Sequence, residues 1–179
     1  QGHYSPKKID DDFSKEVFTK YLETIDPEKQ LFLQSDLNQL KGYEDKIDDE
    51  IHGAPLQSFQ AINKVYEKRL AEYLNSYKGI LDKPFHFDKD EVLVDDKARI
   101  NYASSEKERS EMWRKRLKYQ VLVRYADLIA SEEKNKDKKD FKPRSEADME
   151  KEAREKVLKS TDRIAERLRS KFTEEDRFN

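Results

Sequence analysis

The spacing of apolar residues along the chain predicts a series of amphipathic helices. Neighbouring apolar positions are mostly three to five residues apart, a spacing that keeps them on one face of a helix. Four segments carry this pattern most clearly, and each is expected to bury one face. Their apolar positions are Phe13, Val17, Phe18, Tyr21, Leu22 and Ile25; Phe59, Ile62, Tyr66, Leu70, Tyr73, Leu74, Tyr77 and Leu81; Met112, Trp113, Leu117, Val121, Tyr125 and Leu128; and Met149, Ala153, Val157, Ile164, Leu168 and Phe172.

Polar residues and prolines set the expected boundaries in the first part of the chain. One of the residues Asp10–Asp12 is expected to cap the first helix, since a carboxylate suits a helix N-terminus. The pair Asp26-Pro27 ends that helix, because a residue before proline is disfavoured in the helical region. Pro27 fits the first turn of a new short helix. Ser35 or Asp36 is then expected to cap a segment that carries Leu37 and Leu40.

The remaining helices are bounded in the same way. Gly42 is expected to kink or interrupt the segment with Leu37 and Leu40. A polar helix is expected at residues 43–51, and Gly53-Ala54-Pro55 stops it. Residues 55–81 are predicted to form the longest helix. Ser105 with Glu108 fits a capping box for a helix that runs to about Ala130, and Ser145 with Asp148 caps the last helix. Residues 131–142 are highly charged and predict a solvated linker, and residues 173–179 a frayed end.

Residues 83–101 depart from the helical pattern. Phe85 and Phe87, and then Val92 and Val94, alternate with polar residues, which is compatible with a small β-hairpin or an extended strap across helices. The predicted fold class is therefore all-α: an irregular multi-helix bundle with one extended or β-hairpin-like strap around residues 83–101.

Composition limits the function classes. Charged residues make up 42% of the 179 residues and hydrophobic residues 35%, a balance that favours disorder, but 11% aromatic residues at helical spacing supply a thin core. The net charge of -2 argues against a general nucleic-acid binder. The absence of cysteine excludes thiolate metal sites, disulfides and cysteine nucleophiles. No run of about 18 apolar residues is present to span a membrane, and residues 1–4 do not resemble a signal peptide.

Acidic and histidine residues offer candidate sites, each with a plainer interpretation. The carboxylate clusters lie where caps and exposed turns are expected, so a structural role is favoured over a catalytic pair. The sequence Asp88-Lys89-Asp90 begins like a calcium loop but lacks its glycine and closing glutamate. The histidines are scattered and lack zinc-site spacing. These clusters are Asp10–Asp12, Asp48–Glu50 and Asp95–Asp96, and the histidines are His3, His52 and His86.

Nucleophilic catalysis and partner binding have plainer alternatives as well. Ser14 and Ser35 lie near predicted caps, no serine lies in a glycine-rich elbow, and most lysines have polar neighbours, so no catalytic residue, cofactor or metal is assigned. The basic patch Arg114-Lys115-Arg116 with Lys118, near Trp113 and Tyr119, suits nucleic-acid stacking, but a solvated helix face is favoured. The aromatic face Phe59, Tyr66, Tyr73 and Tyr77 suits a groove for a partner helix or peptide, although core packing is favoured.

The order of residues in the first forty positions carries a resemblance. The residues Asp12-Phe13-Ser14, Phe18, Tyr21-Leu22, Asp26, Phe32-Leu33 and Ser35-Asp36, preceded by His3-Tyr4, resemble the N-terminal helical domain of tail-specific, or carboxy-terminal processing, proteases. The similarity continues through the helix at 66–77, Lys83-Pro84-Phe85 with Phe87, and Trp113 with Leu117-Lys118, so it spans most of residues 3–130. Residues 131–142 are less alike and are interpreted as an insertion.

The resemblance implies a non-catalytic scaffold domain of a periplasmic or cell-envelope serine endopeptidase of a bacterium. Such proteases also contain a PDZ domain and a protease domain with a Ser/Lys dyad, and neither is found in this chain. The implied partners are those two domains, protein or peptide substrates, and an adaptor protein. The expected division is a helical domain at 1–130, a linker or insertion at 131–143, and a terminal helix at 144–179 that belongs to the same domain or leads to the PDZ domain. A free-standing helical adaptor is the alternative.

Overall fold

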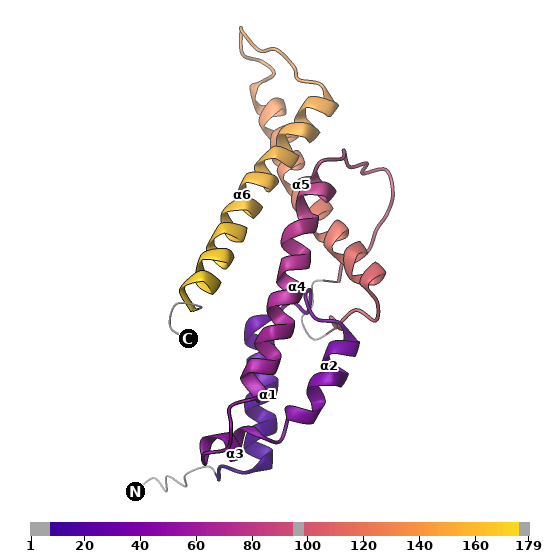
Figure 1. Cartoon of the computed structure of the whole chain (residues 1–179). Helices are drawn as coiled ribbons and strands as arrows, with labels where there is room; N and C mark the ends of the chain where they lie inside the picture. The colour runs from indigo at the N-terminus through magenta and orange to yellow at the C-terminus, as the bar shows by residue number, and fades with distance from the viewer. Residues whose placement is uncertain (1–7, 95–98, 176–179) are drawn as a thin grey trace, which may run out of the picture. The chain divides into compact units, whose positions relative to one another are not determined.

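The computed structural model describes residues 8–94 and 99–175 of the chain, with the backbone alone for 171–175. The described residues form helices and no strand, which confirms the all-α prediction (Figure 1). They are grouped into two compact units, residues 1–73 with 94–112 and residues 74–93 with 113–179, and α4 and α5 run through both. The helices are α1 (Asp11–Ile25), α2 (Gln34–Leu40), the 3-10 helix η1 (Lys41–Tyr43), α3 (Ile47–Ile51), α4 (Ser58–Leu81), α5 (Glu106–Asn135) and α6 (Glu146–Glu175).

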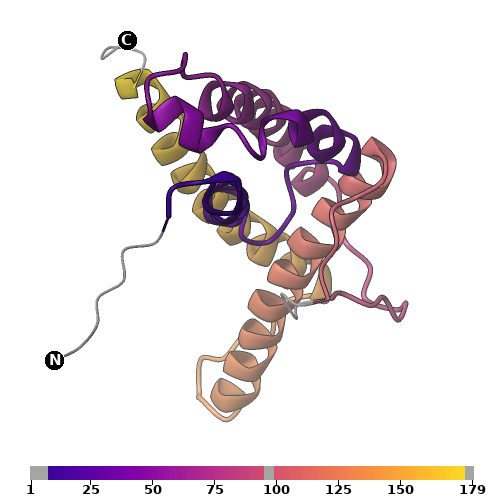
Figure 2. The ribbon, with the colours of Figure 1, turned by 90° about the horizontal axis from the view of Figure 1, so that it is seen from below.

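The core of the first unit lies between α1, α2, α3 and the N-terminal part of α4. Figure 2 shows this unit from below, with α1 seen end-on. The Tyr21 ring meets the Phe59 ring edge-on at 4.9 Å, and the Tyr21 hydroxyl donates to Asn63 at 2.6 Å. The predicted apolar faces of the first helix and of the helix after Gly53 are therefore packed against each other. The buried members of this core are Phe18, Leu22, Phe32, Leu40, Ile47 and Ile62.

The corner after α1 is held by a single buried carboxylate. Asp10 caps α1 by accepting from the Phe13 N–H, and α1 ends at Ile25, as predicted. Asp26 is 2% exposed and accepts hydrogen bonds from the backbone N–H groups of Gln30, Leu31 and Phe32 at 2.9 to 3.1 Å. These bonds satisfy three backbone donors and neutralise the cost of burying the carboxylate.

Three predicted boundaries in this unit are wrong. Pro27 lies in a turn rather than in a helix, since the Lys29 N–H donates to the Asp26 carbonyl and Lys29 adopts a φ of 50°. Leu33 is the residue that precedes α2, and Asp36 is instead the third residue of that helix, where it accepts from the Leu33 N–H. The helix expected at 43–51 is divided into η1 and the short α3.

A tertiary contact also explains the short α3 and the late start of α4. The Asp48 N–H donates to the Ser14 hydroxyl, which in turn donates to the Asp48 carboxylate. The Glu50 carboxylate accepts from the backbone N–H groups of Gln57 and Ser58 at 3.0 and 2.8 Å. Because this carboxylate from α3 caps α4, the helix begins at Ser58 and not at Pro55.

A buried ion-pair network joins α2, α4 and α5 inside the first unit. The Arg69 guanidinium binds Asp36 through two hydrogen bonds of 2.8 Å, and it also contacts Glu72. Arg109 donates to the Leu31 carbonyl at 2.8 Å and forms a short ion pair with Glu72. Burial opposes ionisation of Asp36, but the Arg69 and Leu33 donors outweigh it, so the pKa of Asp36 is lowered.

The second unit contains the end of α4, most of α5, and α6. The predicted face of α5 is buried at Trp113, Leu117, Val121 and Leu128. On α6 the predicted stripe is correct at Met149, Ala153 and Val157 but wrong at Ile164, which is 55% exposed. The buried face continues instead in steps of four through Thr161 and Ala165. Phe172, also expected on this face, lies outside the residues whose side chains are described.

The long helices extend beyond their expected ends. The prediction that the helix ending at Leu81 is the longest is wrong, since α5 and α6 are each 30 residues and α4 is 24. The serine caps are confirmed: Ser105 accepts from the Glu108 N–H, and Ser145 accepts from the Asp148 N–H. α5 continues past Ala130 to Asn135, because Glu132, Glu133 and Lys134 are good helix formers, so only the part of the expected linker after 135 lies between the helices.

Candidate functional site

The clearest candidate site in the second unit is the segment at residues 83–94, called the strap below. It follows α4 and, over these residues, forms neither helix nor strand. The Phe85 N–H donates to the Glu150 carboxylate on α6 at 2.9 Å. The Phe87 ring stacks on Tyr125 of α5 at 5.4 Å between centroids. These two contacts hold an extended segment against two helices without backbone pairing.

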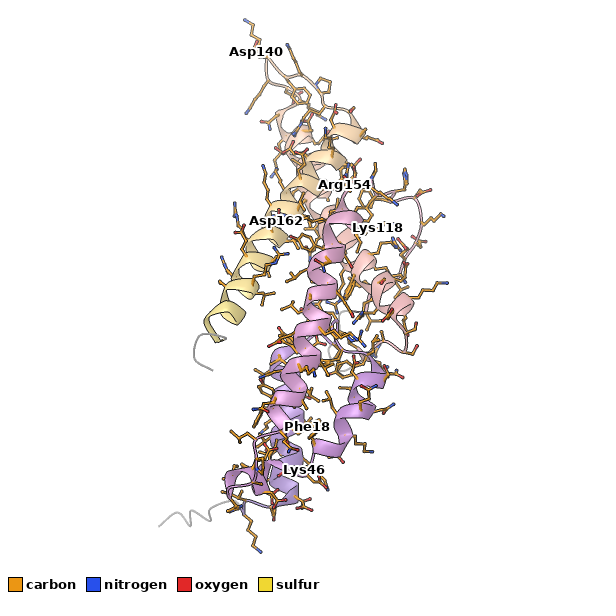
Figure 3. All side chains as sticks on the ribbon, in the orientation of Figure 1. Phe18, Lys46, Lys118, Asp140, Arg154 and Asp162 are labelled. Atoms are coloured by element: carbon orange, nitrogen blue, oxygen red, sulfur yellow. The ribbon has the colours of Figure 1, made fainter. Side chains whose placement is uncertain are left out.

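A third anchor of the strap is electrostatic. Glu91 accepts hydrogen bonds from Arg114 and Lys118 of α5. The Arg114 hydrogen bond, followed by that from Lys118, lowers the pKa of Glu91 to about 2. The carboxylate is therefore ionised at every physiological pH, and the strap stays attached to α5. Lys118, which is labelled in Figure 3, also lies 5.9 Å from the Phe87 ring centroid, in a cation–π contact.

Arg154 of α6 supports the other end of the strap. Its side chain is largely buried and pairs with Glu150 at 2.9 Å. It also donates to the carbonyls of Leu81 and Asp82 at 2.9 and 3.1 Å, where the last carbonyls of α4 have no helical partner. Farther along α6 lies Asp162, labelled with Arg154 in Figure 3. Tyr77 donates a short hydrogen bond to Asp162, and Lys78 approaches the same carboxylate at 3.5 Å. These bonds fix α6 to the end of α4.

Two concave surfaces lie along α6, and one of them borders the strap. That surface has a volume of about 770 Å³, and its lining of Pro84–Asp88, Tyr125 and six residues of α6 between Glu146 and Arg154 mixes aromatic rings with both signs of charge. The other has about 640 Å³ between the end of α4 and α6, and its lining combines both signs of charge with Leu81 and Leu158. Such surfaces suit a peptide or a neighbouring protein segment better than a small reacting molecule, since no nucleophile–base pair converges on them among their lining residues.

The carboxylate clusters of the sequence are separated by the fold. Asp10 caps α1, Asp48 binds Ser14, and Glu50 caps α4. The Ser14 bond lowers the pKa of Asp48, which is therefore a carboxylate with a structural partner. Asp95–Asp96 lie outside the described residues. These hydrogen bonds support a structural rather than a catalytic role for Asp10, Asp48 and Glu50.

The metal candidates do not converge among the residues that the structure describes. His52 and His86 are both exposed, on α3's C-terminal side and in the strap, and His3 lies outside the described residues. Asp88, Lys89 and Asp90 are exposed in the strap. Within residues 8–94 and 99–175, no group of three or more His, Asp or Glu residues is arranged to hold a metal ion.

The serine candidates have ordinary surroundings. Ser14 is fully buried, and its hydroxyl donates a hydrogen bond to the Asp48 carboxylate. Ser35 is exposed on the second residue of α2. A serine nucleophile needs a base within hydrogen-bond reach, and the partner of Ser14 is a carboxylate of lowered pKa, which is a weak base.

The basic patch on α5 is half-buried, and two of its residues anchor the strap. Arg114 and Lys118 form ion pairs with Glu91 of the strap. Trp113 is 2% exposed and is therefore unavailable for stacking on a base, whereas Tyr119 is exposed. Sequence reasoning missed Glu91 and Glu150 as the anchors of the strap. Their partners lie at least twenty positions away, and no local pattern indicates such pairs.

None of the four aromatic residues proposed to line a groove on α4 is exposed. Tyr77 is 1% exposed, and Phe59, Tyr66 and Tyr73 are half-buried. Phe59 packs on Tyr21 and Tyr66 lies 6.2 Å from Phe32 between centroids. This face serves internal packing, and it gives no support to a partner groove. No helix among the described residues has the length and apolar character needed to cross a bilayer.

Comparison with known proteins places these features in a family context. The sequence model of the family described as "Tail specific protease N-terminal domain" matches residues 1–179. The chain is also 29% identical over 123 residues to the tail-specific protease of Haemophilus influenzae (strain ATCC 51907 / DSM 11121 / KW20 / Rd). That alignment covers 68% of this chain and 18% of the relative, so the chain spans less than one fifth of the relative's length.

Proposed function

Because this chain belongs to the tail-specific protease N-terminal domain family, we propose that it is the non-catalytic helical scaffold domain of a C-terminal processing serine endopeptidase. The match over residues 1–179 is the observation that carries this function. The catalytic Ser/Lys dyad then belongs to a protease domain of the parent protein and not to this chain. The periplasm of a bacterium is the proposed location, in keeping with the bacterial relative.

Within the parent protein, the proposed role is to help enclose the substrate and to position the PDZ and protease domains. The length of the relative leaves room for both domains outside this chain. The concave surface beside the strap supports this role, because its lining mixes aromatic and charged residues, as contact with another protein segment requires. The charged surface between α4 and α6 also suits such contact. An adaptor protein is a further proposed partner of these surfaces.

We propose that α6 belongs to the same domain as the helices before it. Arg154 and Asp162 bind the end of α4, and Glu150 binds the strap. These contacts support residues 144–179 as a part of the helical domain. The segment after α5, within the expected linker at 131–143, is proposed as an insertion between two packed helices.

The test compares the parent reading frame with the chain alone. We expect the reading frame to continue past Asn179 into PDZ and protease sequence, and the parent to cleave an unstructured reporter with a nonpolar C-terminus. The purified 179-residue chain is expected to leave the same reporter intact. Cleavage by the chain alone, or a reading frame that stops directly after Asn179, contradicts the proposed function.

A further inference from the structure

The strap contacts α5 and α6 in the way that a bound peptide contacts a receptor. Over residues 83–93 it forms neither helix nor strand. Its described contacts with the two helices are made by the side chains of Phe87 and Glu91 and by one backbone N–H group, that of Phe85. A segment that is held through so few groups can be replaced by another segment that offers the same groups.

The groups that bind the strap are positioned by the helices themselves. Arg114 and Lys118 are one turn apart on α5, so both side chains reach the same carboxylate. Tyr125 lies two turns farther along the same helix. Glu150 of α6 is 8% exposed and is oriented by Arg154 at 2.9 Å. These helix positions and this ion pair fix the binding groups without any contribution from the strap.

Lys118 binds two groups of the strap at once. Its side chain is 13% exposed, its ammonium group pairs with Glu91, and it lies 5.9 Å from the Phe87 ring centroid. The strap bends between these two residues, so a ring and a carboxylate four positions apart converge on one lysine. Tyr125 adds a second aromatic surface for the same ring. The site therefore selects an aromatic residue that is followed four positions later by a carboxylate.

The strap fills this site incompletely. Val92 is 79% exposed, and a hollow of about 100 Å³ remains between the strap and α5, with Leu93 and Leu122 in its lining. The Glu91 side chain is 25% exposed, so solvent reaches the ion pairs that hold it. Its pKa of about 2 keeps it ionised, so protonation does not release it and a competing group is needed. A segment that fills the hollow gains contacts that the strap does not make.

We propose that the face of α5 and α6 beneath the strap is a binding site for an irregular polypeptide segment, and that the strap occupies this site as an internal competitor. The segment carries an aromatic residue and, four positions later, a carboxylate. Its source is an unstructured protein substrate, an assignment that rests on the proposed function. The strap is tethered beside the site at a high effective concentration, so only a segment that binds better than the strap takes its place.

A synthetic peptide with the sequence of residues 84–93 tests the site, when it is labelled at its N-terminus, amidated at its C-terminus and followed by fluorescence anisotropy. Phe87→Ser combined with Glu91→Gln weakens the internal competitor. The peptide should bind this double variant with a Kd about tenfold or more below that for the wild-type chain. Asp90→Asn is the matched control: it removes an exposed strap carboxylate for which no helix contact is described, and it should leave the Kd at the wild-type value. Circular dichroism confirms that each variant is folded.

A double-mutant cycle tests the recognised motif. In the strap-weakened variant, Lys118→Met should raise the Kd of the strap peptide about fivefold or more, because the ion pair and the cation–π contact are lost. The same substitution should have less effect on a peptide with glutamine in place of Glu91. Strap displacement can also be measured in the wild-type chain, where a saturating concentration of the strap peptide should speed amide hydrogen exchange of residues 85–93. That measurement needs no variant to fold.

Two results would overturn the proposal. A strap peptide that binds the strap-weakened variant no better than the wild-type chain, or no better than a scrambled peptide of the same composition, overturns the site. A Lys118→Met effect that is equal for both peptides overturns the motif. Cleavage of the reporter by the parent protein is measured without strap variants, so failure of the proposed function is distinguished from failure of this site.

Discussion

Replacing Arg69 with methionine is the sharpest perturbation of the first unit. Methionine retains most of the apolar stem of the arginine but removes both hydrogen bonds to Asp36 and the contacts to Glu72. Asp36 then keeps only the Leu33 N–H as a donor among the bonds described above. The Arg69 and Asp36 side chains are 7% and 6% exposed, so water cannot replace the lost partner without opening the unit.

The size of the effect follows from the cost of an unpaired buried charge. Removing one partner of a buried ion pair costs about 3–5 kcal/mol. The carboxylate can escape this cost only by binding a proton. At pH 7 that step costs about 4 kcal/mol for a group with an ordinary pKa of 3.8. We therefore expect Arg69→Met to lower the free energy of unfolding by about 3–4 kcal/mol at pH 7.

The pH dependence gives an independent prediction. In the wild-type chain the folded-state pKa of Asp36 is lowered, so its contribution to stability is present above pH 4 and is lost as the pH falls through the folded pKa. In the variant, burial without a partner raises that pKa, and protonation relieves the unpaired charge as the pH falls. The difference in unfolding free energy between wild type and variant should therefore shrink from pH 7 to pH 4.

Urea unfolding followed by circular dichroism at both pH values measures this difference. Arg69→Met combined with Asp36→Leu should recover part of the lost stability, because it removes the unpaired charge as well. Lys20→Met is the matched control, since Lys20 belongs to an exposed pair with Glu16 and its loss should leave stability unchanged. A loss below about 1 kcal/mol at pH 7, or a loss that does not shrink towards pH 4, would refute the reasoning.

Three further changes test the caps and the strap. Glu50→Ala should lower the free energy of unfolding by about 1–2 kcal/mol in the same urea assay, because α4 loses its N-terminal cap, and an unchanged midpoint contradicts that role. Phe87→Ala should speed amide hydrogen exchange in the strap, since the stacking on Tyr125 is lost, whereas equal exchange rates would show that the ring does not hold the segment. Glu91→Gln should also speed that exchange, and in the wild type the effect of pH on strap exchange, corrected for the intrinsic rate, should appear only near pH 2, where Glu91 becomes neutral. A transition near pH 4 would contradict the lowered pKa.

The helical core could be predicted from the sequence because it depends on local spacing. The buried positions from Phe18 to Leu22 in α1 and from Trp113 to Leu128 in α5 lie on the faces that the apolar pattern indicates. The caps at Asp10, Ser105 and Ser145 are also local, since each bond joins residues three positions apart. A cap whose hydrogen bond lies within one helical turn can be predicted from the sequence alone, because no tertiary contact is needed to form it.

The missed features depend on residues that are distant in sequence. Glu50 caps α4 from a different helix, and Ser14 holds Asp48 across 34 positions, so both boundaries differ from the prediction for reasons that no local pattern contains. The strap anchors also join residues that are distant in sequence. Glu91 can bind Arg114 only when α5 has packed beside the strap. The exposure of Ile164 has a different cause: the buried face of α6 follows steps of four to the polar Thr161, which a search for apolar residues passes over.

Helix α5 carries a second set of apolar residues that counting along one face does not reveal. Counting along one face finds Trp113, Leu117 and Val121, and the remaining apolar residues of the helix are then easily attributed to the same face. Placed on a helix of 3.6 residues per turn, Tyr119, Leu122 and Ile129 fall on the opposite side. This second set stays exposed among the described residues, because the buried face of α5 is the one that carries Trp113, Leu117 and Val121.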